Sequence, residues 1–301
     1  MAAQLIDGRQ IAADVRADVA REVEEMAAMG VKPGLAVVLV GEDPASQVYV
    51  RMKAKACREA GIEAKDLTLS EDTSEQELLD LIDELNADPS VNGILVQLPL
   101  PDQIDAQLVM ERILPEKDVD GFHPVNIGRM ASGDTNAFRP ATPAGVQEML
   151  KRIDFDPSGK HAVVVGRSNI VGRPMAAILS QKEPGANATV TVAHSRTQDM
   201  AAVCRLADLL IVAIGRPEFV TADMVKDGAV VIDVGVNRVD DDTKKTGYRL
   251  VGDVAFDEVA EKASWITPVP GGVGPMTIAM LLKNTARAAR QAAETVGAAS
   301  A

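Results

Sequence analysis

A serine, a tyrosine and a lysine share the spacing of one helical face in the segment SQVYVRMK, residues 46–53. A helix advances about 100° per residue, so Ser46, Tyr49 and Lys53 would lie within a sector of about 60°. A lysine can carry protons near neutral pH when burial and neighbouring charges lower its pKa. Lys53 is therefore the candidate acid/base group, although the same spacing also fits a polar stripe on a surface helix.

Further polar candidates lie in the first half of the chain. Gln97 interrupts the apolar segment GILVQLPLP, where a buried amide needs hydrogen-bond partners. Asp118 and Asp120 lie in PEKDVDGFHP, where Asp-Gly is ordinary turn chemistry. Each position alone has a structural explanation. Together they predict one polar set at strand ends and loops, where open α/β sheets bind ligands.

The second half contains a Gly-rich turn between an apolar segment and a helix-like segment, VVVGRSNIVGRPMAAIL, residues 163–179. Gly166 and Gly172 flank it, and Ser168 stands where a dinucleotide motif has its second glycine. Backbone N–H groups at a helix N-terminus suit a pyrophosphate. The motif alone is weak, but three more apolar segments follow it, as a nucleotide-binding domain requires.

The next strand-like segment ends in VAHSRTQD, and this ending predicts NADP rather than NAD. An NAD site usually has a carboxylate there for the ribose hydroxyl. Here the tip carries His194, Ser195 and Arg196, and the first carboxylate is Asp199. Hydroxyl and guanidinium groups, including Arg167 in the Gly-rich turn, attract a 2′-phosphate. The alternative is that these are solvated loop residues.

Alternating strand-like and helix-like segments must position these groups. The strand candidates are rich in Val and Ile without polar alternation, as in a parallel sheet buried on both faces. A helix begins at Ser74 with a Ser-x-x-Glu capping box and ends before Pro89. The alternation predicts an α/β fold. The predicted strands are residues 35–41, 92–101, 161–166, 188–194, 208–215 and 229–235.

Residues 123–145 are rich in Gly, Pro, Asn and Ser and show little periodicity, which indicates a domain boundary near residue 140. We expect a first domain over 1–139, joined by a last helix over 275–296, and a nucleotide-binding domain over 140–274. The Gly- and Pro-rich loop before the last helix can bring backbone close to a flat ligand, or form a rigid turn without one. The final segment, GAASA, is expected to fray.

Composition excludes several classes of partner. The chain has 301 residues, 47% hydrophobic and 25% charged, which suits two globular domains. Its net charge is −13 and it has no basic stripe, so nucleic acid and anionic membranes are poor partners. Without a secretory signal or a long apolar run, a cytoplasmic location is expected. Two cysteines form no disulfide framework, and three scattered histidines predict no metal site.

The chain resembles the bifunctional methylenetetrahydrofolate dehydrogenase/methenyltetrahydrofolate cyclohydrolase (FolD) family. The resemblance covers nearly the whole chain. It implies an N-terminal α/β folate-binding domain, a C-terminal Rossmann-like NADP domain and a cleft between them. It also implies folate substrates, a homodimer, and a place in purine, methionine and histidine supply. The matching segments are VGEDPASQVYVRMKAKACREAGI, GILVQLPLP, PEKDVDGFHPVNIGR, VVVGRSNIVGRPMA, HSRT, VIDVGVNR, GDV and TPVPGGVGPMT.

The resemblance implies two successive reactions, NADP-dependent oxidation of 5,10-methylenetetrahydrofolate and hydrolysis of the 5,10-methenyl product to 10-formyltetrahydrofolate. Lys53 corresponds to the catalytic lysine and Gln97 to the glutamine that hydrogen-bonds and tunes it. Tyr49 corresponds to the tyrosine beside the pterin, and Asp120 to the aspartate that holds the pterin ring.

In the cofactor domain, the resemblance assigns Gly166, Arg167 and Ser168 to the cofactor turn. It places Ser195 beside the 2′-phosphate and Val236 on the nicotinamide side. Pro270 and Gly271 line the folate site. One departure is Ala141, where the family commonly has a cysteine, so any contact of that thiol is absent.

Three other interpretations compete. The pair Tyr49 and Lys53 also matches the catalytic pair of short-chain dehydrogenases, but in that family the Gly-rich turn precedes the pair, and here it follows. A nucleotide-sensing or scaffold protein would fail to reduce NADP with methylenetetrahydrofolate. A dehydrogenase without hydrolase activity would not need Lys53, Gln97 and Asp120 together.

Overall fold

The computed structural model describes residues 2–244 and 247–299. They form two compact units. The first unit comprises Ala13–Ala141 and the described residues from Ile278 onward. The second unit comprises the described residues up to Ala12 and Thr142–Thr277. Each unit has its own parallel sheet.

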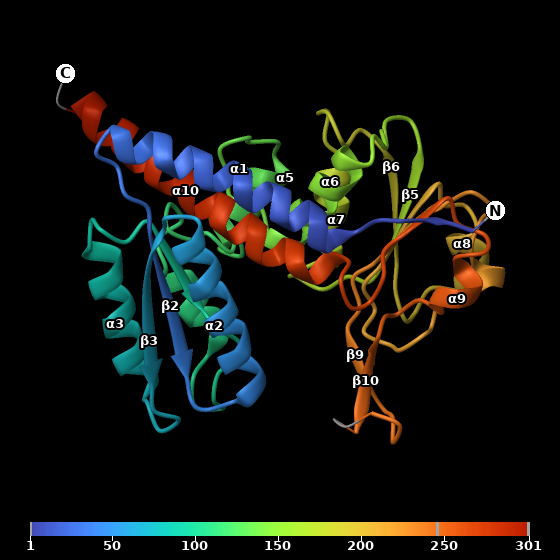
Figure 1. Cartoon of the computed structure of the whole chain (residues 1–301), viewed down its shortest axis with the longest axis horizontal. Helices are drawn as coiled ribbons and strands as arrows, with labels where there is room; N and C mark the ends of the chain where they lie inside the picture. Colours follow the sequence, from blue (N-terminus) through green and yellow to red (C-terminus); the bar gives the residue numbers. More distant parts are fainter. Residues whose placement is uncertain (1, 245–246, 300–301) are drawn as a thin grey trace. The chain divides into compact units, whose positions relative to one another are not determined.

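The sheet of the first unit has three parallel strands in the order β3 (Glu63–Leu69), β2 (Gly34–Val40), β4 (Gly93–Val96). Alternate residues of β2 face two cores. Leu35, Val37 and Leu39 share a core with helix α2 (Pro44–Glu59), and Ala36, Val38 and Val40 share one with helix α3 (Glu75–Ala87). Figure 1 shows the two helices flanking this sheet. Burial on both faces explains why β2 is uniformly aliphatic.

Two long helices lie side by side in Figure 1, α1 (Gly8–Ala28) and α10 (Val273–Ala299). Arg290 of α10 pairs with Glu22 of α1 at 2.6 Å. Asn284 of α10 donates its side-chain N–H to the Val119 carbonyl at 2.8 Å. The last helix therefore contributes to the core of the first unit. Of the segment expected to fray, Ser300 and Ala301 lie outside the described residues.

The second unit has a six-stranded parallel sheet in the order β1-β11-β8-β7-β5-β6. Its strands are β1 (Gln4–Leu5), β5 (His161–Val165), β6 (Thr189–Ala193), β7 (Leu209–Val212), β8 (Val230–Asp233) and β11 (Trp265–Ile266). The chain runs from β5 to its neighbour β6, and then crosses to β7 on the other side of β5 and on to β8. The gap between β5 and β7 is thus a topological switch point, where open α/β sheets bind ligands at the carboxyl ends of the strands.

Shorter elements complete the described structure. An antiparallel hairpin, β9 (Asn237–Asp240) with β10 (Tyr248–Val251), projects from the second unit in Figure 1. The remaining elements are α4 (Ala106–Arg112), α5 (Pro124–Ala131), α6 (Ala141–Arg152), α7 (Gly172–Leu179), α8 (Met200–Cys204), the 3-10 helix η1 (Ala222–Met224) and α9 (Phe256–Val259).

The α/β prediction is confirmed, and three details of it were wrong. The strand expected over 92–101 ends at Val96, because the prolines that follow cannot donate to a ladder. β6 is half-exposed rather than buried on both faces, because it is an edge strand. The stretch 123–145, expected to be irregular, contains α5, which opens with the His123 ring accepting from Val125 N–H at 3.0 Å.

The sequence did not reveal that the first residues belong to the sheet of the second unit. β1 pairs with β11 in parallel, and Ile6 N–H donates to Ile266 O at 2.9 Å. Ile6 is completely buried. A two-residue strand is too short to show any periodicity, so β1 could not be predicted.

Within the described residues, no helix combines the length and apolar composition that crossing a bilayer requires.

Candidate active site

Lys53 lies on α2, as the sequence predicts. The helix begins after Asp43, whose carboxylate accepts from Ser46 N–H at 2.7 Å, with Pro44 in the first turn. Ser46 and Lys53 are 3% and 9% exposed, whereas Tyr49 is 51% exposed. The face is therefore not a solvated polar stripe. It buries a lysine and leaves an aromatic ring open to a ligand.

Gln97 is the hydrogen-bond partner of Lys53. The Nζ atom of Lys53 donates to Oε1 of Gln97 at 3.0 Å. The side-chain N–H of Gln97 donates to Leu98 O at 2.7 Å, and its backbone N–H donates to Val38 O at 2.8 Å. These two bonds orient the amide so that its oxygen faces Lys53. The amide in the apolar segment therefore has partners on both of its ends.

Lys53 and Asp120 influence each other electrostatically. Burial lowers the pKa of Lys53, and the negative charge of Asp120 opposes this shift. Burial raises the pKa of Asp120, and the positive charge of Lys53 opposes that shift. In both groups burial is the larger effect, so each is drawn toward its neutral form. Both groups are therefore candidates for accepting and returning a proton.

Asp118 supports the turn that carries Asp120. The Asp118 carboxylate accepts from the N–H groups of Gly121, Phe122 and His123 at 3.1, 3.2 and 2.8 Å, and from Nδ2 of Asn126 at 2.9 Å. Burial raises the pKa of Asp118 to about 6, against the effect of these bonds. Turn chemistry alone could not distinguish the roles of Asp118 and Asp120. The contacts of Asp118 give it a structural role.

The Gly-rich turn of the second unit fits a pyrophosphate. Gly166 has φ 135°, and a Cβ there would lie 2.2 Å from Ala213 O. A Cβ on Gly172 would lie 2.2 Å from Gly166 O. Ser168 Oγ accepts from Val171 N–H at 3.1 Å at the start of α7. The backbone N–H groups of residues 167–170 have no acceptor among the described residues, so they are open to an anion.

Ser195 and Arg196 lie exposed in the turn after β6. The turn is held by His194, whose N–H donates to Thr197 Oγ1 at 2.8 Å and whose ring accepts from Arg196 N–H at 3.2 Å. The first carboxylate after them, Asp199, accepts from Ala202 N–H at 3.0 Å and caps α8. The Ser195 hydroxyl and the Arg196 guanidinium are therefore exposed in this turn, ahead of the first carboxylate.

The structure places the remaining candidates, one for the nicotinamide side and two for the folate site, after strand ends. Val236, 54% exposed, follows β8, and Pro270 and Gly271 follow β11. Because the strands are parallel, these residues share one edge of the sheet with the turns after β5 and β6. The candidates Tyr49, Lys53, Gln97 and Asp120 belong to the first unit instead.

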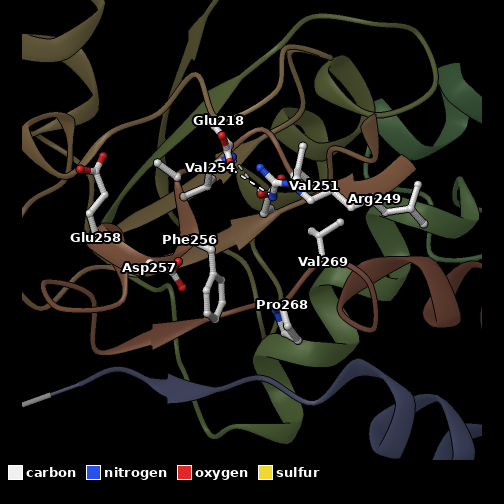
Figure 2. Close-up of a pocket in the computed structure, with 13 residues that line it drawn as sticks. Glu218, Arg249, Val251, Val254, Phe256, Asp257, Glu258, Pro268 and Val269 are labelled. Atoms are coloured by element: carbon white, nitrogen blue, oxygen red, sulfur yellow. Dashed lines mark hydrogen bonds and ion pairs between the residues drawn. The ribbon is translucent and has the colours of Figure 1, made fainter. Parts of the chain in front are cut away.

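A pocket of about 400 Å³ lies elsewhere in the second unit (Figure 2). Phe256, Pro268 and Val269 give it an apolar side, and Glu218 and Arg249 form an ion pair at 3.7 Å in its lining. The described residues that line it include none of the predicted site residues. We therefore do not assign it to the active site.

Two acidic residues that the sequence did not single out are Asp233 and Asp253. Both are buried, at 3% and 0% exposed. A signal was present, because each interrupts an apolar segment that also contains a glycine, in VIDVG and GDV. A buried carboxylate needs hydrogen-bond donors, and these segments alone could not show which donors it has.

Comparison with known proteins gives consistent matches along the chain. The tetrahydrofolate dehydrogenase/cyclohydrolase catalytic domain matches residues 6–120, and the NAD(P)-binding domain of the same family matches residues 140–293. A curated relative, Bifunctional protein FolD of Moorella thermoacetica, is 60% identical over 291 residues, which cover 97% of this chain and 100% of that protein.

Two solved structures are also similar. The bifunctional FolD methylenetetrahydrofolate dehydrogenase/cyclohydrolase from Campylobacter jejuni has a TM-score of 0.91 and 50% identity, and the match covers 96% of this chain and 99% of that one. FolD from Trypanosoma brucei, complexed with NADP cofactor and inhibitor, has a TM-score of 0.90 and 40% identity over 97% of this chain and 99% of that one.

Proposed function

Because the chain belongs to the tetrahydrofolate dehydrogenase/cyclohydrolase family, we propose that it oxidises 5,10-methylenetetrahydrofolate with NADP and hydrolyses the 5,10-methenyl product to 10-formyltetrahydrofolate. The observation that carries the hydrolytic step is the 3.0 Å bond between buried Lys53 and Gln97. The test follows NADPH formation and methenyl hydrolysis separately on the purified protein. Activity in neither assay would reject the proposal and favour a binding protein.

In the hydrolytic step, Lys53 is the proton carrier. The methenyl substrate is a cation, so a permanently charged lysine beside it would repel it. Burial lowers the pKa of Lys53, which favours the neutral amine and so reduces this repulsion. As water adds to the one-carbon bridge, neutral Lys53 accepts a proton from it. The resulting ammonium then returns this proton to the nitrogen that leaves as the carbon–nitrogen bond breaks. The second proton of the added water, on the hydroxyl of the adduct, passes to solvent as the formyl C=O forms.

The other residues orient the ligands. Tyr49 presents an exposed ring that can pack on the pterin, and Asp120 can accept hydrogen bonds from its ring nitrogens. Bound NADP would supply the hydride acceptor for oxidation of the one-carbon bridge. The protein then needs only to hold the ligands, with Gly166, Arg167 and Ser168 at the pyrophosphate.

The remaining assignments are proposals of the same kind. Ser195 binds the 2′-phosphate, Val236 contacts the nicotinamide, and Pro270 and Gly271 line the folate site. A homodimer, a cytoplasmic location, and domain limits at 1–139 with the helix 275–296 and at 140–274 are proposed from the family resemblance and the sequence. They are tested by light scattering, by fractionation and by expression of the separate segments.

Replacing Gln97 with alanine should lower the hydrolysis rate by roughly 10-fold or more, because Lys53 loses the acceptor that places it. A carbonyl acceptor also favours the protonated lysine, so its loss should move the apparent pKa of hydrolysis to lower pH. The measurement is a pH–rate profile. Gln103→Ala is the control, since its amide contacts loop carbonyls of Glu71 and Thr73. An unchanged profile for Gln97→Ala would contradict the role.

Replacing Ser195 and Arg196 together with alanine should weaken NADPH binding by roughly 10- to 100-fold and leave NADH binding nearly unchanged. The reason is the loss of charged hydrogen bonds to the 2′-phosphate. Fluorescence titration of both cofactors gives the two dissociation constants. Lys182→Ala, which removes an exposed cation from the loop after α7, is the control. Equal or tighter binding of NADH by the native protein would contradict the NADP assignment.

A further inference from the structure

Two buried carboxylates of the second unit have no part in the mechanism above. Asp253 accepts four hydrogen bonds. Its Oδ2 accepts from the N–H groups of Ile214 and Gly215, both at 2.8 Å. Its Oδ1 accepts from Arg216 N–H at 2.9 Å and from Nδ2 of Asn237 at 2.8 Å. One side chain therefore fixes three consecutive peptides after β7 and a side chain after β8.

Asp233, the last residue of β8, holds Asp253 in turn. Its Oδ1 accepts from the N–H groups of Gly235 and Asp253, both at 3.0 Å. Its Oδ2 accepts from Val254 N–H at 2.9 Å. Asp233 thus fixes the backbone at Asp253, and Asp253 fixes the segment after β7.

Two glycines make this close packing possible. A Cβ on Gly235 would lie 2.2 Å from the Asp253 carboxyl carbon, and a Cβ on Gly252 would lie 1.7 Å from Asp233 Oδ2. Asp253 therefore packs against Gly235, which lies two residues after Asp233. Asp233 packs in turn against Gly252, which directly precedes Asp253. We name the set of Asp233, Gly235, Gly252 and Asp253 the Asp-Gly clasp.

The clasp acts at the edge of the sheet where the cofactor candidates lie. Residues 214–216 follow β7, and the Gly-rich turn at Gly166 follows β5, so both border the switch point between these strands. Residues 235–237, which include Val236, follow the adjacent strand β8. Asp233, Gly252 and Val254 also line the pocket of Figure 2.

We propose that Asp253 is a positioning residue for cofactor binding, acting through the backbone of residues 214–216 and the side chain of Asn237. This inference rests on the proposed function, since it takes the carboxyl edge of the sheet as the NADP site. Asp253 itself is completely buried and its carboxylate is used by protein donors. Its effect on the cofactor is therefore indirect, through the shape of the two segments it holds.

The test replaces Asp253 with asparagine, which keeps the shape but turns an N–H group toward backbone N–H donors. We expect the dissociation constant for NADPH, measured by fluorescence titration, to rise about tenfold or more. Cyclohydrolase activity without cofactor should remain near the native rate, because Lys53, Gln97 and Asp120 belong to the other unit. In the dehydrogenase assay, KM for NADP should rise more than kcat falls.

Asp208→Asn is the matched control. Asp208 lies at the amino end of β7 and accepts from His161 N–H at 2.9 Å and from Lys226 Nζ at 2.6 Å. Its loss should lower Tm without changing the dissociation constant for NADPH. An unchanged constant in Asp253→Asn, or an equal rise in Asp208→Asn, would overturn the inference. If Asp253→Asn does not fold, Asn237→Ala, which removes one of the four bonds, is tested instead. A smaller rise in the dissociation constant for NADPH would support the inference, and an unchanged constant would overturn it.

Failure of the inference and failure of the proposed function give different results. If native protein binds NADPH and Asp253→Asn binds it equally well, only the inference fails. If native protein binds no NADPH by direct titration and forms none in the dehydrogenase assay, the proposed function fails first.

Discussion

Lys53→Met is expected to reduce methenyltetrahydrofolate hydrolysis by at least about 100-fold, the lower range of what a positioned acid/base group contributes. Methionine keeps the volume of the buried side chain and removes the group that accepts and returns the proton. The dehydrogenase reaction should retain more activity than the hydrolase, because hydride transfer needs no proton at Lys53. The measurement follows both reactions on one preparation.

Lys55→Met is the control for this substitution. Lys55 lies on the same helix, 75% exposed, and pairs with Glu59 at 3.6 Å. Exposed pairs of this kind contribute about 0.3–0.5 kcal/mol, so both activities should stay near native. A Lys53→Met protein that hydrolyses the methenyl substrate at the native rate would refute the assignment of Lys53. Loss of both activities together with a lower Tm would point to a structural role instead.

Gly166→Ala is expected to remove most NADPH binding and to lower the free energy of unfolding by about 2–4 kcal/mol. The new Cβ would lie 2.2 Å from Ala213 O, which is a backbone atom and cannot rotate away. The φ angle of 135° adds strain for any residue with a Cβ. The turn after β5 and the end of β7 must therefore move apart, and the open N–H groups of residues 167–170 lose their arrangement.

Gly228→Ala separates the two causes. Gly228 has φ 78°, and no described heavy atom lies within 4 Å of a Cβ built there. It should therefore lose only the strain energy, about 1–2 kcal/mol, and bind NADPH normally. Urea unfolding and fluorescence titration of both variants make the comparison. Equal stability and equal binding of the two would show that the close approach at Gly166 has no consequence.

The structural elements that the sequence predicted correctly were those with a strong local pattern. Uninterrupted aliphatic segments such as LAVVLVG are buried on both faces, so their composition alone indicates a central parallel strand. The Ser74–Glu77 capping box forms as expected, with reciprocal bonds at 3.3 and 2.8 Å. The edge strand β3, with the sequence EAKDLTL, was missed because one side of it faces solvent and carries polar residues.

The site was predictable only in part. Residue types and family resemblance pointed to Lys53 and Gln97, and the structure brings their side chains into contact. Local sequence could not tell that Asp118 supports a turn while Asp120 interacts with Lys53, because both stand in one loop. Nor could it show that Asp253 binds the peptides of residues 214–216, since hydrogen bonds between distant segments leave no local pattern.

The pairing of β1 with β11 has a consequence for synthesis of the chain. Gln4 and Leu5 are synthesised roughly 260 residues before their partners, Trp265 and Ile266. This contact has a very large sequence separation, and such contacts raise contact order and slow folding. The second unit therefore cannot complete its sheet before β11 has been synthesised. Until then β1 has no partner strand, whereas the local βα units around Gly166 can form earlier.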